Sequence, residues 1–134
     1  MKNNLSMFLN FKGNCAEVVE FYKNVFNTTT GRLVRYSDAP GGNQIPGYDD
    51  KIMYTEMMIG DANLMLCDVP PGHDFICGNN FVLTFAAANL DELKRVYNAI
   101  KEGGVVTMEL QKTFFSEHYS MVIDKFGIHW NIMA

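Results

Sequence analysis

Residues 7–26 have the sequence MFLNFKGNCAEVVEFYKNVF, and residues 81–100 have the sequence FVLTFAAANLDELKRVYNAI. Each stretch begins with a run typical of a strand, passes through polar residues and continues with apolar residues at the three- and four-residue spacing of a helix. In each stretch an Asn precedes the helix and a Glu stands three residues later, as in a capping box: Asn14 with Glu17, and Asn89 with Glu92. The order of strand and capped helix therefore occurs twice.

Three further segments typical of strands follow each predicted helix. They are residues 31–36, 52–59 and 62–67 after the first helix, and residues 105–110, 118–124 and 128–133 after the second. Gly60 and Asp61 predict a hairpin turn between two of them, and the Pro- and Gly-rich residues 37–50 predict a long loop. Each half is thus predicted to have the order βαβββ, with module one at about residues 1–70 and module two at about residues 78–134.

A single module of about 60 residues buries too little surface to be comfortably stable alone. We therefore expect one α+β domain over residues 1–134, in which the two modules form an open, barrel-like mixed sheet with the helices on its convex side. A concave groove between the halves is the place where a ligand is expected.

The composition excludes several classes of protein. Of the 134 residues, 48% are hydrophobic and 19% are charged, which are ordinary globular values. The net charge of −4, without a basic run, argues against nucleic-acid binding. We expect no membrane span and no signal peptide, hence a cytoplasmic protein, because no long apolar stretch occurs. The three cysteines do not form a metal motif or a disulfide framework and are expected to be reduced.

Three motifs carry a resemblance to a known family. They are residues 11–17 leading into Phe21-Tyr22, the turn of residues 59–61 before residues 64–68, and the ending of residues 124–130. Together they resemble the PhnB-like branch of the glyoxalase/bleomycin-resistance superfamily, also called vicinal oxygen chelate proteins. The resemblance covers nearly the whole chain.

The resemblance implies paired βαβββ modules, an eight-stranded open sheet and a homodimer, but it implies no single reaction. Superfamily members include isomerases, dioxygenases, thiol transferases and drug-sequestering proteins without catalysis. Members of this branch have also been labelled demethylubiquinone methyltransferases. This chain has no glycine-rich strand-loop-helix start of the kind that seats adenosylmethionine.

In metal-dependent members, the first and last strands of each module supply the ligands. The resemblance places these positions at Met7 or Leu9, within residues 65–67, within residues 82–84, and at Asn131. None of these residues is His, Glu or Asp, the donors that divalent cations need besides thiolate. We therefore predict no metal and no other cofactor. If a metal were found, the donors to test first would be His129, Asp68, Glu56 and His118.

The last strand supplies a candidate catalytic residue, His129, and a candidate ligand-binding residue, Asn131. Alternation along a strand places these two side chains on one face and Trp130 on the other. If Trp130 packs in the core, the polar pair faces the groove. His129 could then act as a general acid or base, because the reference pKa of histidine is about 6.5; the alternative is a partly exposed strand histidine.

Four more residues are candidates for ligand binding: Tyr54, Glu56, Cys67 and Asp68. Tyr54 and Glu56 alternate on one strand face and could line the groove, or Glu56 could be solvated. Cys67 could be a nucleophile, but a buried small residue is the favoured interpretation because no neighbouring cation is evident. Asp68 could orient a ligand or terminate its strand.

Three functions remain open from the sequence. The first is a metal-free protein that binds a small apolar or aromatic molecule in the groove, since Phe, Tyr and Met are abundant. The second is a lyase, isomerase or dioxygenase-like enzyme, either metal-dependent or using His129 as acid or base. The third is a dimeric module without a small-molecule role, which would be favoured if side chains filled the groove.

Overall fold

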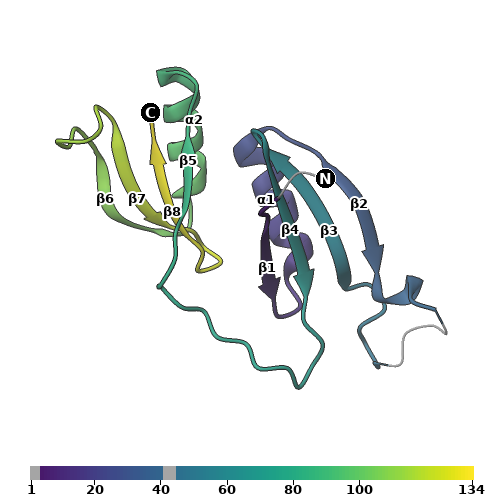
Figure 1. The fold of residues 1–134 in the computed structure, drawn as a ribbon. Helices are drawn as coiled ribbons and strands as arrows, with labels where there is room; N and C mark the ends of the chain where they lie inside the picture. The colour runs from purple at the N-terminus through teal and green to yellow at the C-terminus, as the bar shows by residue number, and fades with distance from the viewer. Residues whose placement is uncertain (1–3, 41–44) are drawn as a thin grey trace. The chain divides into compact units, whose positions relative to one another are not determined.

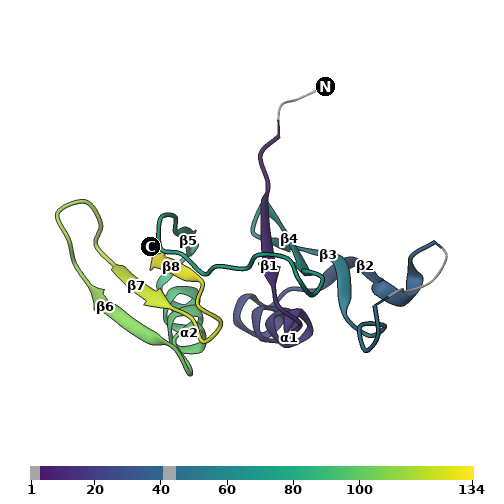
Figure 2. The same cartoon turned by 90° about the horizontal axis from the view of Figure 1, so that it is seen from below.

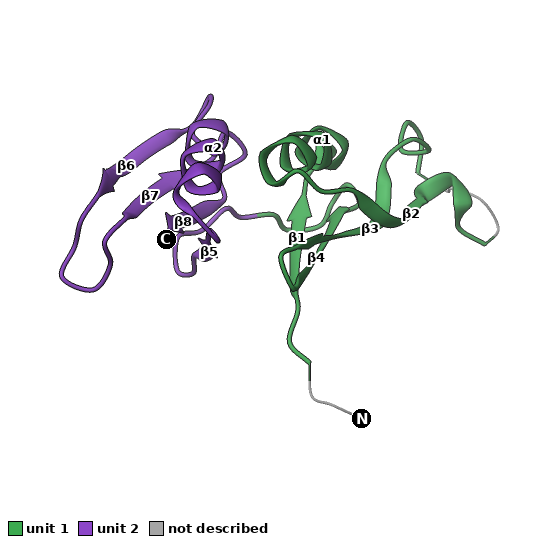
Figure 3. Ribbon diagram, turned by 90° about the horizontal axis from the view of Figure 1, so that it is seen from above, with its two compact units in different colours: residues 1–75 green, residues 76–134 purple. Residues whose placement is uncertain are grey.

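The computed structural model describes residues 4–40 and 45–134 and divides into two compact units, residues 1–75 and residues 76–134 (Figure 3). Each unit is described by itself. The division falls between the modules expected from the sequence. The joining of the two sheets into one domain, and a groove between them, stay predictions.

Unit 1 contains four strands and one α-helix in its described residues (Figure 1). Its elements are β1 (Met7–Phe11), α1 (Cys15–Phe26), β2 (Thr30–Arg35), the 3-10 turn η1 (Tyr36–Asp38), β3 (Ile52–Ile59) and β4 (Ala62–Asp68). The strand order in the sheet is β1-β4-β3-β2, with β1 parallel to β4 and the other pairs antiparallel. The middle of the predicted loop, residues 41–44, lies outside the described residues.

Unit 2 repeats this topology. Its elements are β5 (Leu83–Ala86), α2 (Leu90–Ile100), β6 (Val105–Gln111), β7 (Tyr119–Ile123) and β8 (His129–Met133). The strand order is β5-β8-β7-β6, again with one parallel pair, β5 with β8. The two βαβββ units and the α+β class are therefore as predicted, and neither four-stranded sheet is closed. None of the described helices is long and apolar enough to cross a membrane.

Each helix packs on one face of its own sheet, as Figure 2 shows. In unit 1, Leu9 and Phe11 of β1 and Leu64 and Leu66 of β4 alternate into the core against α1. In unit 2, Trp130 and Ile132 of β8, with Val122 of β7, form the corresponding core. Each sheet therefore has one face covered by a helix and an opposite face, called here its open face.

The two helix starts differ. The predicted capping box at Asn14 is wrong, because the Asn14 side chain makes no capping hydrogen bond. At the second helix the Asn89 side chain accepts a hydrogen bond from the Glu92 amide at 2.9 Å, and Glu92 Oε1 accepts one from the Ala88 amide at 3.0 Å. The first turn of α1 instead uses a carboxylate from a distant strand, described below.

Candidate functional site

Alternate residues of the three neighbouring strands β1, β4 and β3 form a continuous part of the open face of unit 1. Its side chains are Phe8, Asn10, Tyr54, Glu56, Met58, Asn63, Met65 and Cys67. Phe8 is paired with Met65, and Met65 is paired with Glu56, so these three residues form one row across the sheet. Phe8 is 47% exposed and Met58 is 48% exposed, so apolar surface on this face remains in contact with solvent.

Tyr54 connects the aromatic and acidic parts of this face. Its hydroxyl donates a hydrogen bond to Glu56 Oε2 at 2.6 Å. Its ring lies 6.1 Å from the ring of Phe8, centroid to centroid, with an interplanar angle of 52°. Tyr54 and Glu56, predicted as candidates from their alternation, therefore do lie together, and Phe8 joins them from β1.

The hydrogen bond to Glu56 also affects the pKa of the Tyr54 hydroxyl. It raises the pKa of the Tyr54 hydroxyl above its usual value; desolvation and the charge of Glu56 act in the same direction, whereas Arg32 lowers it. At neutral pH the phenol therefore stays protonated and remains a hydrogen-bond donor to the carboxylate.

Glu56 borders a hollow of about 400 Å³ at one end of β2 and β3. The hollow is lined by Thr28, Thr29, Thr30, Gly31, Glu56, Met57, Met58 and Asn63. A Cβ atom at position 31 would lie 3.2 Å from both Cγ and Oε1 of Glu56, so the glycine leaves room for this carboxylate. The acidic group is thus both accessible and held in place.

Cys67 lies on the same face beside Asn10. Its thiol donates a hydrogen bond to Asn10 Oδ1 at 3.2 Å. Burial, and next the charge of Asp68, raise the pKa of the Cys67 thiol to about 11. A thiol held neutral in this way is a poor nucleophile, so the structure favours the interpretation of Cys67 as a small structural residue.

Asp68 has a structural role and is not available to a ligand. Its side chain is only 1% exposed. Oδ1 accepts hydrogen bonds from the amides of Gly13 and Cys15, both at 2.9 Å, and Oδ2 accepts one from the amide of Ile52 at 3.0 Å. The carboxylate therefore joins the β1–α1 turn, the end of β4 and the start of β3, which corrects its selection as a ligand-binding candidate.

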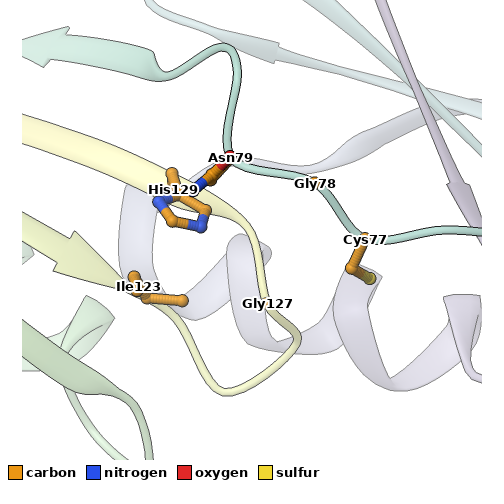
Figure 4. A pocket seen from close by; sticks show the side chains of 6 residues that line it. All are labelled: Cys77, Gly78, Asn79, Ile123, Gly127 and His129. Carbon is orange, nitrogen blue, oxygen red and sulfur yellow. The ribbon is translucent and has the colours of Figure 1, made fainter.

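A second hollow, of about 480 Å³, lies in unit 2 next to His129 (Figure 4). It is lined by Cys77, Gly78, Asn79, Ile123, Gly127 and His129. Ile123 of β7 is the register partner of His129 of β8, and Cys77 lies over the β7–β8 turn, with its Sγ 3.6 Å from the position of a Cβ atom on Gly127. His129 is thus half-buried on the open face, as the alternation of β8 predicts.

Asn131 shares the open face of unit 2 with Thr84, its register partner on β5. Its Nδ2 atom donates a hydrogen bond to Thr84 Oγ1 at 3.3 Å. Its Oδ1 atom is buried and has no hydrogen-bond partner among the described residues. One side of this amide is therefore left with an unused acceptor.

Trp130, between these two residues, lies in the core, as predicted. It is 3% exposed, and its indole Nε1 donates to Asp124 Oδ2 at 3.0 Å. The second oxygen of Asp124 accepts hydrogen bonds from the amides of Phe126 and Ile128 at 2.9 Å and 3.0 Å. Asp124 thus stabilises the β7–β8 turn and the indole together.

The residues at the superfamily's metal positions do not fit a metal. Leu9 is buried, and alternation puts Met7 on the same side, so neither side chain lies on the open face; the open face of β1 presents Phe8 and Asn10. Within each unit, the described residues contain no group of three or more His, Cys, Asp or Glu side chains able to hold a metal ion. We derive no chemistry through a metal.

Phe8 and Asn10 belong to the open face but were not identified from the sequence as site residues. Alternation within residues 7–11 contains the necessary signal, because Leu9 and Phe11 are the core pair and Phe8 and Asn10 must point the other way. Their contact with β3 residues depends on strand order, which alternation does not give.

Comparison with known proteins agrees with this fold. A family model described as 3-demethylubiquinone-9 3-methyltransferase matches residues 3–133. Protein PA1353 from Pseudomonas aeruginosa is 27% identical, with a TM-score of 0.84 over 97% of both chains. The PhnB protein from Bacillus cereus is 21% identical, with a TM-score of 0.82 over 98% of both chains.

A glyoxylase/bleomycin resistance protein/dioxygenase domain from Frankia sp. EAN1pec is 12% identical, with a TM-score of 0.69 over 99% of this chain and 97% of that domain. The likeness to the Bacillus and Frankia structures concerns the fold alone. The fold is that of the Bacillus and Frankia structures, and the match of the family model over residues 3–133 identifies the chain as a member of the family described as 3-demethylubiquinone-9 3-methyltransferase.

Proposed function

We propose that this chain binds a small apolar or aromatic molecule on the open face of unit 1, without a metal. The observation that carries the proposal is the partly exposed row of Phe8, Met65 and Glu56, with the Tyr54 ring beside it. Exposed aromatic and thioether side chains with a few polar anchors are typical of small-molecule sites, and methionine adapts to ligands of different shape. The adjoining hollow of about 400 Å³ is within the usual size range.

The family's description names a methyltransferase, but the described residues do not fit adenosylmethionine. The β1–α1 connection contains a glycine, and its Gly13 and Cys15 amides already donate to the buried Asp68. At the β5–α2 connection the amides of Ala88 and Glu92 are bonded within the turn. Neither strand-to-helix connection leaves these amides free for a cofactor, so we derive no methyl-transfer step.

Binding can be tested with the neutral fluorescent probe N-phenyl-1-naphthylamine, whose emission increases in apolar surroundings. We expect saturable binding by the wild-type protein. Phe8→Ala should weaken it by up to about tenfold, because an aromatic contact contributes about 0.5–1.5 kcal/mol and 1.4 kcal/mol corresponds to tenfold in affinity.

Phe114→Ala is the matched control for this test, because Phe114 is 101% exposed and lies in the connection between β6 and β7. Its affinity for the probe should equal that of the wild type. Equal loss in both variants, or no saturable binding by the wild type, would contradict the proposal. Circular dichroism should show that Phe8→Ala remains folded.

The metal-free part of the proposal has its own measurement. Purified protein should contain much less than one equivalent of Zn, Ni, Mn or Fe, and EDTA should leave its melting temperature unchanged. Stoichiometric metal lost together with stability would contradict the proposal and direct attention to His129, Glu56 and His118, since Asp68 is already used by three backbone amides.

A second candidate function is an enzyme that uses His129 as acid or base. The observation that favours it is the hollow of about 480 Å³, which is lined by His129 of β8 and by Cys77 and Asn79 from the segment before β5. Incubation with a small-molecule cell extract, followed by NMR, should then show a compound that the wild type consumes and His129→Asn does not. Unchanged turnover in His129→Asn would exclude this role.

A further inference from the structure

Along β1, β4 and β3, the open face of unit 1 has one charged side chain among the described residues, the carboxylate of Glu56. On β2, alternation puts Arg32 on the same face as Val34, the register partner of Tyr54. The Oε2 atom of Glu56 accepts the hydrogen bond of the Tyr54 hydroxyl at 2.6 Å. No other hydrogen bond or ion pair in the described part of the chain occupies the second oxygen, Oε1. Glu56 is therefore oriented by Tyr54 and keeps an unused acceptor.

The absence of a side chain at Gly31 leaves space for the Oε1 atom of Glu56. The Glu56 side chain crosses Gly31 of β2, where a Cβ atom would lie 3.2 Å from Oε1. The same carboxylate lines the hollow of about 400 Å³ together with threonine residues, Met58 and Asn63. A ligand group that enters the hollow can thus reach a carboxylate oxygen directly.

One aromatic ring, that of Tyr54, contacts the carboxylate, and the ring of Phe8 lies beside Tyr54, two strands from Glu56. The rings of Phe8 and Tyr54 are tilted by 52° at a centroid distance of 6.1 Å. The face of an aromatic ring attracts a cation, and cages of such rings recognise alkylated ammonium groups. The hydrogen bond from Tyr54 to the carboxylate strengthens this attraction, since it increases the electron density of the phenol ring.

We propose that Glu56, Tyr54 and Phe8 select a ligand with a positive charge, namely a small organic amine whose ammonium group meets Glu56 and whose apolar body covers Phe8 and Met65. This proposal rests on the small-molecule binding proposed above and names the ligand's chemical class. An anionic ligand would instead bring its charge against an unneutralised carboxylate, which is unfavourable at short range.

Arg32 is the opposing charge in the neighbourhood. It is exposed on β2, and its charge lowers the pKa of Tyr54, so it is close enough to act on the site. It makes no ion pair with Glu56 within 4.0 Å among the described residues, so the carboxylate is not neutralised by direct contact. Arg32 reduces the attraction for a cationic ligand without abolishing it.

The test compares benzylamine, which is charged at pH 7, with benzyl alcohol, which has nearly the same shape and is neutral. Both are titrated against the full chain by NMR and by displacement of N-phenyl-1-naphthylamine. We expect the wild type to bind the ammonium form about tenfold more tightly than the alcohol. Added salt should weaken this preference, because the pair is partly exposed.

Three variants make the test specific to the carboxylate. Glu56→Gln should bring the affinity for benzylamine down to that of benzyl alcohol while leaving the alcohol and the neutral probe within about twofold. Arg32→Gln should raise the preference for benzylamine. Glu20→Gln removes the same charge from the exposed surface of α1 and should leave both affinities unchanged.

The outcomes separate the two proposals. If the neutral probe binds but benzylamine binds no better than benzyl alcohol, the cationic ligand class is wrong and small-molecule binding stands. If the preference persists in Glu56→Gln, Glu56 does not select charge and the inference is overturned. If none of the three molecules binds the wild type, both proposals fail.

Discussion

Replacing Asp68 with Asn should lower the free energy of unfolding, although the two side chains have almost the same size. Asp68 accepts three backbone hydrogen bonds, from Gly13, Cys15 and Ile52. An amide presents one oxygen and one NH₂ group, so at least one of these amides would face another donor. If the oxygen stays with Gly13 and Cys15, the amide of Ile52 loses its acceptor.

The magnitude follows from two contributions. A buried donor without a partner costs about 1–3 kcal/mol. The carboxylate also lies at the N-terminus of α1, where a negative charge contributes about 0.3–1 kcal/mol and about 2 kcal/mol when partly buried. Together these predict a loss of about 2–4 kcal/mol, which is a large part of the 5–15 kcal/mol typical of a domain.

The measurement is urea unfolding followed by far-ultraviolet circular dichroism. With a slope of about 1–3 kcal/mol per molar urea, the midpoint should fall by roughly 0.7–4 M. Asp61→Asn is the control, because Asp61 is exposed in the β3–β4 turn and loses the same charge. A midpoint equal to that of the wild type, or an equal fall in the control, would refute the assignment of Asp68 as the linking carboxylate.

The remaining predictions concern the core, the thiols and assembly. Trp130→Ala should cost about 3–5 kcal/mol of unfolding free energy, the usual loss for a large buried aromatic residue, as measured by urea unfolding. Iodoacetamide should label the exposed Cys77 first and Cys67 slowly, with peptide mass spectrometry showing Cys67 labelling increase only as the pH rises toward about 11. Burial raises the pKa of the Cys67 thiol from 9.0 to about 11, so the folded state favours the neutral thiol. The stability that this contributes should be complete below pH 9 and lost as the pH rises through 11, and thermal melts across this range can measure the loss. Sedimentation should give about 30 kDa, twice the 15.2 kDa chain, if the open edges of the sheets pair in a homodimer, and a persistent monomer at micromolar concentration would refute this.

Alternation and spacing were sufficient to predict the order of the elements. The bounds of β3 agree with the prediction, and His129 and Trp130 lie on the faces that alternation gives them. These features are local, because each depends on the period of one strand or one helix. The same local rule, applied to β1, would have placed Leu9 in the core and Phe8 on the open face.

The features that could not be predicted depend on contacts between distant segments. Asn14 has the residue type of a helix cap, but the carboxylate of Asp68, brought by β4, takes the amides at this turn. The cluster of Phe8 with Tyr54 and Glu56 requires the strand order β1-β4-β3, which places β1 two strands from β3. Neither the period nor the composition of a segment contains that order.

The parallel pairs of the two sheets have a consequence for the chain as it is synthesised. β1 pairs with β4, and β5 pairs with β8. In each unit the second strand of this pair is synthesised after the helix and two further strands. Until then the apolar side of β1, with Leu9 and Phe11, emerges from the ribosome next to α1 but without a neighbouring strand. Such late, non-local pairing slows folding and leaves a strand edge open to other chains. Each unit is therefore most exposed to aggregation, and most dependent on chaperones, in the interval between the synthesis of its first strand and that of its last.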